Sequence, residues 1–254
     1  SVMFDYLNNA DGLGKHSIDE LQKLTAGKTV SLIMKTSDDA FVAQGSTTPN
    51  DLELQLKLLA AKTSDMGFRL ETAAQWPGLA SILRTNFMSD PVQRFTSTWP
   101  QLLSYGDYRF GIANPDELAR RTIEELKQAV DADLKSGPLE IALVGDIDET
   151  QAISLVARTL GALPKRARAS KLTIAQKRRL FTADRKMAVL VHEGKDEQGL
   201  IAFNWPTTDD NDLKSSQGRE LLAAVLGLQM TEVIREKLGA TYTPTALSVG
   251  SRNF

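Results

Sequence analysis

The stretch PLEIALVGDIDETQAISLVARTLGALPKR, residues Pro138–Arg166, is typical of a strand that leads directly into a helix. Leu139–Val144 is an apolar run of strand length, and Gly145–Asp148 has the composition of a turn. Glu149–Leu160 has helical spacing, and Gly161 suits the position just past a helix end. The pattern predicts a protein that contains both helices and strands. How the strands pair has to be inferred from the neighbouring segments.

The segments before this stretch alternate between helices and short strands. Ser17 and Glu20 have the spacing of a capping box, so we expect a helix to begin there. Thr29–Met34 and Phe41–Gln44 follow as two short strands joined by a polar turn. Further helices are expected over residues 47–65, over 70–86, which Pro77 interrupts or begins, and over 114–137, capped by Asn114; residues 87–113 are expected to be rich in loops.

The segments after it begin with a basic run. Residues 164–186 hold nine Lys or Arg and one acid, Asp184, which is typical of a solvated linker or of a patch for an acidic partner. Strands are then expected over 186–194, 198–206 and 240–249, with a long helix over 213–239. Hairpin-like strand pairs favour an α+β fold with mixed, largely antiparallel sheets and helices packed on one face, rather than a doubly wound parallel sheet.

Charge and composition exclude several classes of function. The 254 residues carry a net charge of -2, which argues against bulk electrostatic binding to nucleic acid or to an anionic membrane. No apolar run reaches the roughly 18–20 residues of a membrane helix, so we expect no membrane insertion. The absence of cysteine excludes disulfides and thiolate metal sites.

The motifs of common catalytic sites are absent from the chain. The two histidines, His16 and His192, are far apart, and neither H-E-x-x-H nor H-x-x-E-H occurs. There is also no G-x-S-x-G, P-loop or G-x-G-x-x-G pattern. Asp146, Asp148 and Glu149 lack the further oxygen ligands of a calcium site, and Asp146 can instead cap the helix that follows. We therefore predict no catalytic residue and no bound metal or cofactor in this chain.

Several segments together resemble the pitrilysin/insulinase family of zinc metallopeptidases, which includes the mitochondrial processing peptidases. In that family a strand ends in V-G-D-x-D and a helix leads to F-G-x-L-P; residues 160–164 here read LGALP. The segments DGLGKHSIDELQKLTAGKTVSL and STTPNDLELQLKLLAAKTSD resemble the preceding part of the same domain. IAFNWPTTDD, the long helix and IREKLGATYTP resemble the opening of the next domain.

The resemblance implies a chamber of homologous α+β domains in two halves, of which one carries an inverted zinc motif. This chain resembles the C-terminal, inactive half, as a fragment: residues 1–164 as the later part of one domain, 165–186 as a basic linker and 187–254 as the opening of the following domain. It implies zinc on the other half and that N-terminal half as partner, in the same chain or as a separate subunit. It also implies a peptide substrate and a bacterial periplasmic or membrane-associated location.

The family's inactive half presents an arginine and a tyrosine to the substrate, which the resemblance places at Arg235 and Tyr242. Gly239 is expected to end the helix between them, so that the tyrosine lies on the strand that follows. The alternative is structural: Arg235 pairs with Glu232 or Glu236, and Tyr242 fills a half-buried strand face.

Two functions remain open on this evidence. The chain is either the non-catalytic portion of a zinc metallopeptidase, inactive alone, or a non-enzymatic peptide-binding or assembly module of the same fold. Incomplete domains expose sheet edges, so we also expect self-association into a homo-oligomer.

Overall fold

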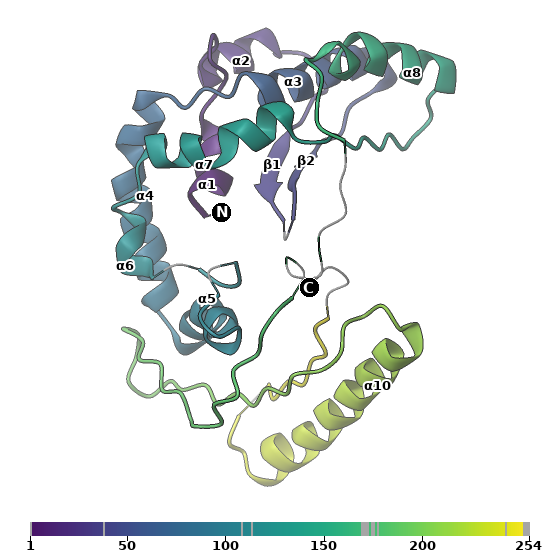
Figure 1. The fold of residues 1–254 in the computed structure, drawn as a ribbon. Coiled ribbons are helices and arrows are strands. Elements are labelled where there is room, and N and C mark those ends of the chain that lie inside the picture. Colours follow the sequence, from purple (N-terminus) through teal and green to yellow (C-terminus); the bar gives the residue numbers. More distant parts are fainter. Residues whose placement is uncertain are drawn as a thin grey trace. The chain divides into compact units, whose positions relative to one another are not determined.

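The computed structural model describes residues 2–37, 39–107, 109–112, 114–168, 173, 176, 178–241 and 243–250. The chain divides into two compact units. Unit 1 comprises Ser1–Lys171 and Thr182–Leu200, and unit 2 comprises Leu172–Phe181 and Ile201–Phe254. The fold is rich in helices and contains a small antiparallel sheet, so the predicted α+β class is confirmed (Figure 1).

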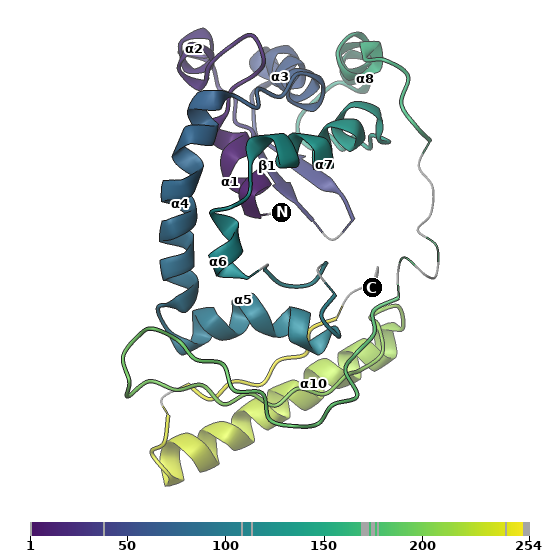
Figure 2. The same cartoon turned by 60° about the vertical axis from the view of Figure 1, so that its left-hand side comes forward.

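Unit 1 holds most of the regular structure. Its long helices are α1 (Val2–Ala10), α3 (Leu52–Ser64), α4 (Leu70–Met88), α5 (Pro91–Leu103), α7 (Ile123–Ser136) and α8 (Glu149–Arg158). Its short elements are α2 (Ile18–Leu24), η1 (Pro49–Asp51), α6 (Pro115–Leu118), η2 (Leu160–Ala162) and the strands β1 (Ile33–Thr36) and β2 (Phe41–Gln44). In Figure 2, α4 runs along one side of this unit, where it contacts α1, α5 and α6.

Capping side chains set where several helices begin. The predicted box before α2 is confirmed, because Glu20 N donates to Ser17 Oγ at 3.2 Å and Ser17 N donates to a Glu20 carboxylate oxygen at 2.9 Å. The prediction of a single helix over residues 114–137 is wrong, because two separate helices form there. Asn114 caps only the four-residue α6, and α7 begins after a second capping box formed by Thr122 with Glu125. A second competent cap within one apolar pattern therefore divides the helix.

Prolines misled the prediction for residues 70–113. Helix α4 continues through Pro77, whose neighbours Trp76 and Ala80 are each only 1% exposed, so core packing on both sides offsets the lost backbone hydrogen bond. The stretch expected to be loops contains α5 instead. Pro91 stands at its first position behind the cap Asp90, whose side chain accepts from Gln93 N at 2.9 Å. Proline in that position begins a helix rather than breaking it.

The core of unit 1 consists of three apolar clusters. The first surrounds Trp76, whose Nε1 donates to the Leu118 carbonyl oxygen at 2.8 Å and so joins α4 to the end of α6. The second gathers Phe4 and Met34 between α1 and β1, and the third holds Leu56 of α3 against Leu155 of α8. Burial is therefore concentrated on the helices of this unit.

Most of the predicted strands do not form among the described residues. Strands β1 and β2 pair, antiparallel, with Ile33 opposite Gln44, and Val30 forms an isolated antiparallel bridge with Thr47. The predicted strand Thr29–Met34 is shifted to Ile33–Thr36. The described parts of 139–144, 186–194, 198–206 and 240–249 hold no strand. A strand exists only where a neighbouring backbone supplies hydrogen bonds, and side-chain pattern alone does not provide that neighbour.

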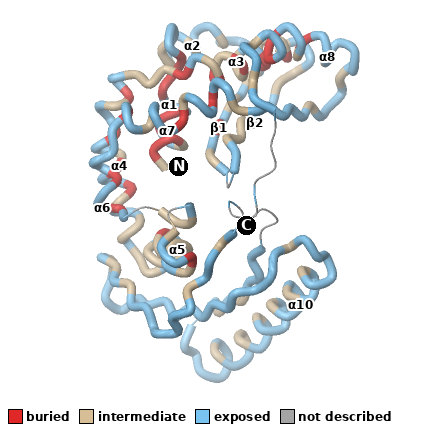
Figure 3. The backbone as a smooth tube through the Cα atoms, in the orientation of Figure 1, coloured by how far each residue is buried: buried red, intermediate tan, exposed pale blue. Residues whose placement is uncertain are grey.

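Unit 2 is built around one long helix, α10 (Leu213–Met230), which continues into the π-helix η3 (Thr231–Lys237). None of the described residues of this unit is buried, and its trace is almost wholly in the exposed colour of Figure 3. Phe203 and Trp205, on an extended segment, stack with ring centroids 6.3 Å apart although they are 77% and 74% exposed. Among the helices of the described ranges, none is long and apolar enough to cross a membrane.

Candidate functional site

Arg235 lies in the π-helical segment η3, at the point where the long helix of unit 2 ends. In a π-helix the backbone bonds run between residues five apart, which widens the turn. Leu238 N donates to the Val233 carbonyl oxygen at 3.1 Å in this pattern. Gly239 then adopts φ +60 and donates to the Arg235 carbonyl oxygen at 3.1 Å. The helix ends at Gly239, as predicted, and its last turn is the wide one.

Arg235 is exposed, and among the described residues its guanidinium has no acidic partner. The alternative that it pairs with Glu232 is not found, because that carboxylate accepts from Lys237 Nζ at 2.7 Å. Within the described ranges, no hydrogen bond or ion pair involves the Arg235 side chain. Tyr242, the second predicted site residue, lies outside the described residues. The structure therefore leaves one predicted substrate-contacting group available at the surface of unit 2.

Polar contacts fix the start of α10. The Asp212 side chain caps the helix by accepting from the backbone N of Ser215 at 3.1 Å. The Ser215 hydroxyl, followed by that backbone N–H, holds the pKa of Asp212 below its ordinary value. Arg219 donates to Asp210 at 2.6 Å and to the Thr208 hydroxyl at 2.8 Å. These bonds tie the first turns of the helix to the extended segment before it.

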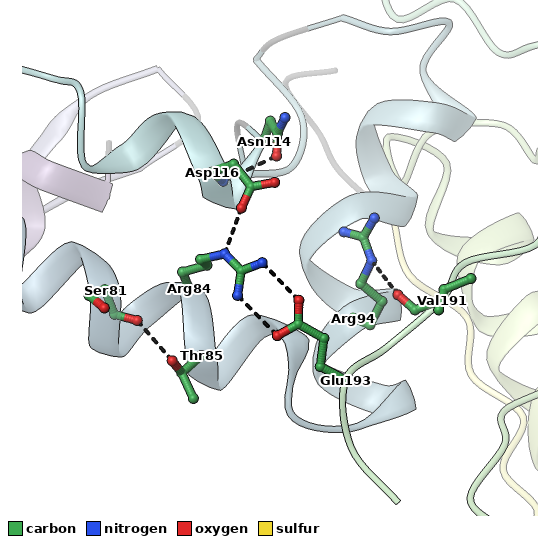
Figure 4. A network of polar contacts seen from close by, with 8 residues as sticks. All are labelled: Ser81, Arg84, Thr85, Arg94, Asn114, Asp116, Val191 and Glu193. Atoms are coloured by element: carbon green, nitrogen blue, oxygen red, sulfur yellow. Dashed lines mark hydrogen bonds and ion pairs between the residues drawn. The ribbon is translucent and has the colours of Figure 1, made fainter. Parts of the chain in front are cut away.

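A second polar cluster lies in unit 1 and is structural in character (Figure 4). The Arg84 guanidinium donates twice to the Glu193 carboxylate, at 2.7 and 3.0 Å, and once to Asp116 at 2.6 Å. Both bonds to Glu193 and the one to Asp116 raise the pKa of Arg84, and Arg84 in turn lowers the pKa of Glu193. Each of the three nitrogens of the Arg84 guanidinium therefore already has an acceptor within the protein.

This cluster fastens residues Thr182–Leu200, which we name the strap, to helices α4 and α5. Glu193 N donates to the Met88 carbonyl oxygen at 2.7 Å, and Arg94 Nε donates to the Val191 carbonyl oxygen at 3.2 Å. At the other end of the strap, Thr182 N donates to the Leu103 carbonyl oxygen at 3.0 Å. The strap begins within the basic run 164–186 and belongs to unit 1.

The two histidines serve local structure. His192 accepts from Gly194 N at 3.1 Å through Nδ1, so its ring proton is on Nε2, which donates to the Gln198 carbonyl oxygen at 3.0 Å. His16 Nδ1 lies 3.8 Å from the Glu20 carboxylate. Among the described residues there is no group of three or more His, Cys, Asp or Glu that could hold a metal ion.

The acidic turn 146–149 also has a structural use. The cap of α8 is Asp148, whose side chain accepts from Gln151 N at 2.8 Å; the expectation that Asp146 is the cap is wrong. The residue directly before the first helical turn has its carboxylate nearest to the free N–H groups, which gives Asp148 the advantage.

The sequence analysis did not identify Glu232 and Lys237 as a pair. Their separation of five residues matches neither the three nor the four of an α-helix, so the pattern carried no expected signal. An acid and a base five residues apart, with the base two residues before a glycine that ends a helix, is the sequence signal that could have indicated a widened turn.

A family model described as the peptidase M16 inactive domain matches residues 120–252. Among the curated proteins, no match to the sequence was found.

Solved structures of proteases share the fold. The periplasmic protease PqqL from Escherichia coli is 18% identical with a TM-score of 0.63, over 98% of this chain and 28% of that one. The first half of PqqL is 15% identical with a TM-score of 0.61, over 98% of this chain and 55% of that one. A mutant of the ferredoxin protease FusC, in complex with Arabidopsis ferredoxin, is 19% identical with a TM-score of 0.54, over 67% of this chain and 19% of that one.

The chain spans at most about half the length of these structures, and at such identities the likeness concerns the fold alone. The family model, in contrast, covers more than half of this chain. It includes α7, α8, the strap, α10 and η3, and therefore the candidate site at Arg235. The chain belongs to the M16 (pitrilysin/insulinase) peptidase family and carries its inactive domain.

Proposed function

We propose that this chain is the non-catalytic, C-terminal portion of a zinc-dependent M16 peptidase, where it contributes to substrate binding. The observation that carries the proposal is the exposed Arg235 guanidinium, left without an acidic partner in a domain of an inactive-half family. A cation kept free of neighbouring acids can donate to a peptide carbonyl oxygen. The proposed partner is the half of the peptidase that carries the zinc motif, and the proposed substrate is a peptide.

Zinc itself does not fit the described residues of this chain, since none of their acids and histidines gather into a ligand set. We therefore place the zinc ion, and the glutamate that acts with it, on the other half. The role of this chain is to bind and orient: Arg235 donates to a substrate carbonyl oxygen, and Tyr242 donates to that carbonyl or to the oxyanion that develops from it. Donors of this kind typically contribute a few kcal/mol to the transition state.

The domain division belongs to the same proposal. Residues 1–164 and 187–254 are proposed as parts of two homologous domains of one half, joined by the basic linker 165–186. The periplasm is the compartment we propose, by analogy with PqqL, a periplasmic protease from Escherichia coli.

The test is a turnover assay with a quenched peptide, in the peptidase formed with the half that bears H-x-x-E-H. We expect Arg235→Ala to raise KM about tenfold and Tyr242→Phe to lower kcat about 100-fold. Lys214→Ala removes the same charge from an exposed position of α10 and is expected to leave both constants unchanged. Unchanged turnover in both site variants would remove the assigned roles.

A second candidate function is a peptide-binding module without catalysis. It is favoured by the extended segment that carries Ile201, Phe203 and Trp205, whose apolar side chains are 74–84% exposed. Such a segment can accept an extended peptide as an added strand. The test is binding of a fluorescent apolar peptide to this chain alone. Binding that is lost in Phe203→Asp but retained in Arg235→Ala would favour the binding module over the peptidase.

A further inference from the structure

We infer that Glu232 and Lys237 are positioning residues for Arg235: their ion pair holds η3 in the π-helical register that keeps the Arg235 guanidinium free. The inference rests on the proposed function, because it assumes that Arg235 contacts substrate. It deepens that proposal by identifying which side chains present the arginine.

The spacing of the pair is diagnostic of the register. On an α-helix, residues five apart are separated by about 7.5 Å along the axis and by about 140° around it, so their side chains do not meet. The Glu232 carboxylate and Lys237 Nζ nevertheless lie 2.7 Å apart. The wider π turn, in which the backbone of residue i bonds to that of i+5, brings these positions onto one face. The ion pair and the π register therefore support each other.

The same register separates Arg235 from an acid that an α-helix would place beside it. On an α-helix Glu232 would neighbour Arg235, three residues on. That contact would neutralise the guanidinium. In the observed segment the Glu232 carboxylate is occupied by Lys237, and the Arg235 side chain is exposed.

The end of the segment is held by the backbone as well. Gly239 N bonds to the Arg235 carbonyl oxygen at 3.1 Å, and Ala240 N bonds to the Ile234 carbonyl oxygen at 3.0 Å. Gly239 adopts a positive φ that other residues rarely take, so the reversal after η3 is built into the sequence. The ion pair thus has to fix only the last turn.

The expected effect is modest, because both partners are partly solvated: the Lys237 side chain is 63% exposed and that of Glu232 is 53%. Exposed ion pairs alter equilibria only slightly, so we expect Glu232→Gln to raise KM about two- to threefold with kcat unchanged. Screening of the pair by salt should reduce the difference from the wild-type peptidase at about 1 M ionic strength.

A double-mutant cycle in the assembled peptidase tests whether the pair acts through Arg235. In the Arg235→Ala background, Glu232→Gln is expected to have no further effect on KM. The charge-swapped variant Glu232→Lys with Lys237→Glu is expected to recover the KM of the wild type. Equal effects of Glu232→Gln with and without Arg235 would overturn the inference, because the pair would then act on stability alone.

The absence of native cysteine allows a direct test of the register. Glu232→Cys with Lys237→Cys is expected to form a disulfide, since only the π register brings the two positions within the roughly 4.4–6.8 Å between Cα atoms that a disulfide needs. The oxidised variant is expected to keep the wild-type KM, and the reduced variant to show the raised one. Gln217→Cys with Leu222→Cys, also five apart but on the α-helical part of α10, is expected to stay reduced.

The possible outcomes separate this inference from the proposed function. If Arg235→Ala impairs turnover while Glu232→Gln does not, the positioning role fails and the substrate role stands. If Arg235→Ala has no effect, both fail, whatever the disulfide shows about the register. Free thiols in the 232/237 variant under oxidising conditions would overturn the π register itself.

Discussion

Two long helices of this chain have nearly the same length and very different surroundings. Helix α4 in unit 1 has 19 residues and buries Thr72, Trp76, Ala80 and Leu83, whereas α10 in unit 2 has 18 residues and buries none. All apolar residues that are buried among the described ones lie between Met3 and Leu160. The difference teaches that the apolar residues of a segment can predict a helix, whereas the burial of that helix depends on which other elements pack against it.

The pattern of α10 is that of a helix suited to contacts on both sides. Leu221, Val225 and Leu228 lie on one side and are 47–72% exposed. On the opposite side, Ala223 and Gly227 are half-buried. Helices with apolar residues all round are typical of protein interiors. In this respect the second half of α10, residues 221–230, resembles a helix of a protein interior.

Matched tryptophan substitutions test the comparison most strongly. Trp76→Ala is expected to lower the free energy of unfolding by about 3–5 kcal/mol, because it removes a side chain that is 1% exposed and leaves a cavity. Trp205→Ala removes the same group at 74% exposure and is expected to change that free energy by no more than about 0.5 kcal/mol. Urea unfolding followed by circular dichroism measures both. A large effect at Trp205 would show that unit 2 has a core in solution.

A buried lysine in unit 1 extends the comparison of the two units, because only packing that removes the side chain from water lowers a lysine pKa in this way. Lys62 of α3 is 8% exposed and donates to the carbonyl oxygens of Asn8 and Gly12. Burial lowers its pKa from 10.5 to about 8, against the opposing effect of Asp11. Between these values the unfolded chain keeps a proton that the folded chain has released, so stability rises with pH through this window.

The rise attributable to Lys62 amounts to about 3 kcal/mol between pH 8 and 10.5. Lys62→Met is expected to remove it, which unfolding curves at pH 8, 9 and 10 would show as a flatter dependence. Lys57→Met, at an exposed position of the same helix, provides the control and should keep the slope. An identical slope in all three proteins would mean that Lys62 is solvated.

The smallest expected effect concerns the strap, which belongs to unit 1 despite its late position in the sequence. Glu193→Gln weakens the paired bonds to Arg84, and we expect tryptic cleavage after Lys186 to be about two- to fivefold faster. Because the pKa of Glu193 is lowered by Arg84, the contribution of the pair is present above the ordinary pKa of a glutamate. It is lost as the pH falls through the lowered value.

A glycine beside this pair gives an independent check on the strap. A Cβ at Gly194 would collide with the Ser89 carbonyl oxygen, so Gly194→Ala should loosen the strap without altering any charge. The control Gly199→Ala, where a Cβ meets no atom within 4 Å, should leave the cleavage rate unchanged. Equal rates in all variants would show that the strap is not held by these contacts.

Local signals in the sequence were sufficient for many of the helices. The capping box at Ser17 and Glu20 and the glycine that ends η3 were found where the pattern placed them. Helix α5 was missed because Pro91 and Pro100 suggested a loop. Pro91 begins the helix and Pro100 lies near its end, so the same residue type stands at two different places in one helix. Only the cap Asp90, directly before Pro91, indicates that a helix begins there.

Strands and the candidate site depend on contacts that local patterns do not contain. Residues 139–144 have the composition of a strand, but Val144 is fully exposed and no neighbouring strand is present among the described residues. For the site, the position of Arg235 at a helix end was predicted, whereas the π turn that frees it was not. That turn arises from a side-chain pair at a spacing that α-helical reasoning does not consider.

The path of the backbone between the two units has a practical consequence for dissecting this protein. Because the chain leaves unit 1 after Lys171, returns at Thr182 and leaves again after Leu200, no single cut separates the two units into intact pieces. A gene fragment that stops at residue 171 would lose the segment that supplies Glu193 and Val191 to α4 and α5. A fragment designed to express unit 1 should therefore end at residue 200. It then includes residues 172–181, which belong to unit 2, as an insertion.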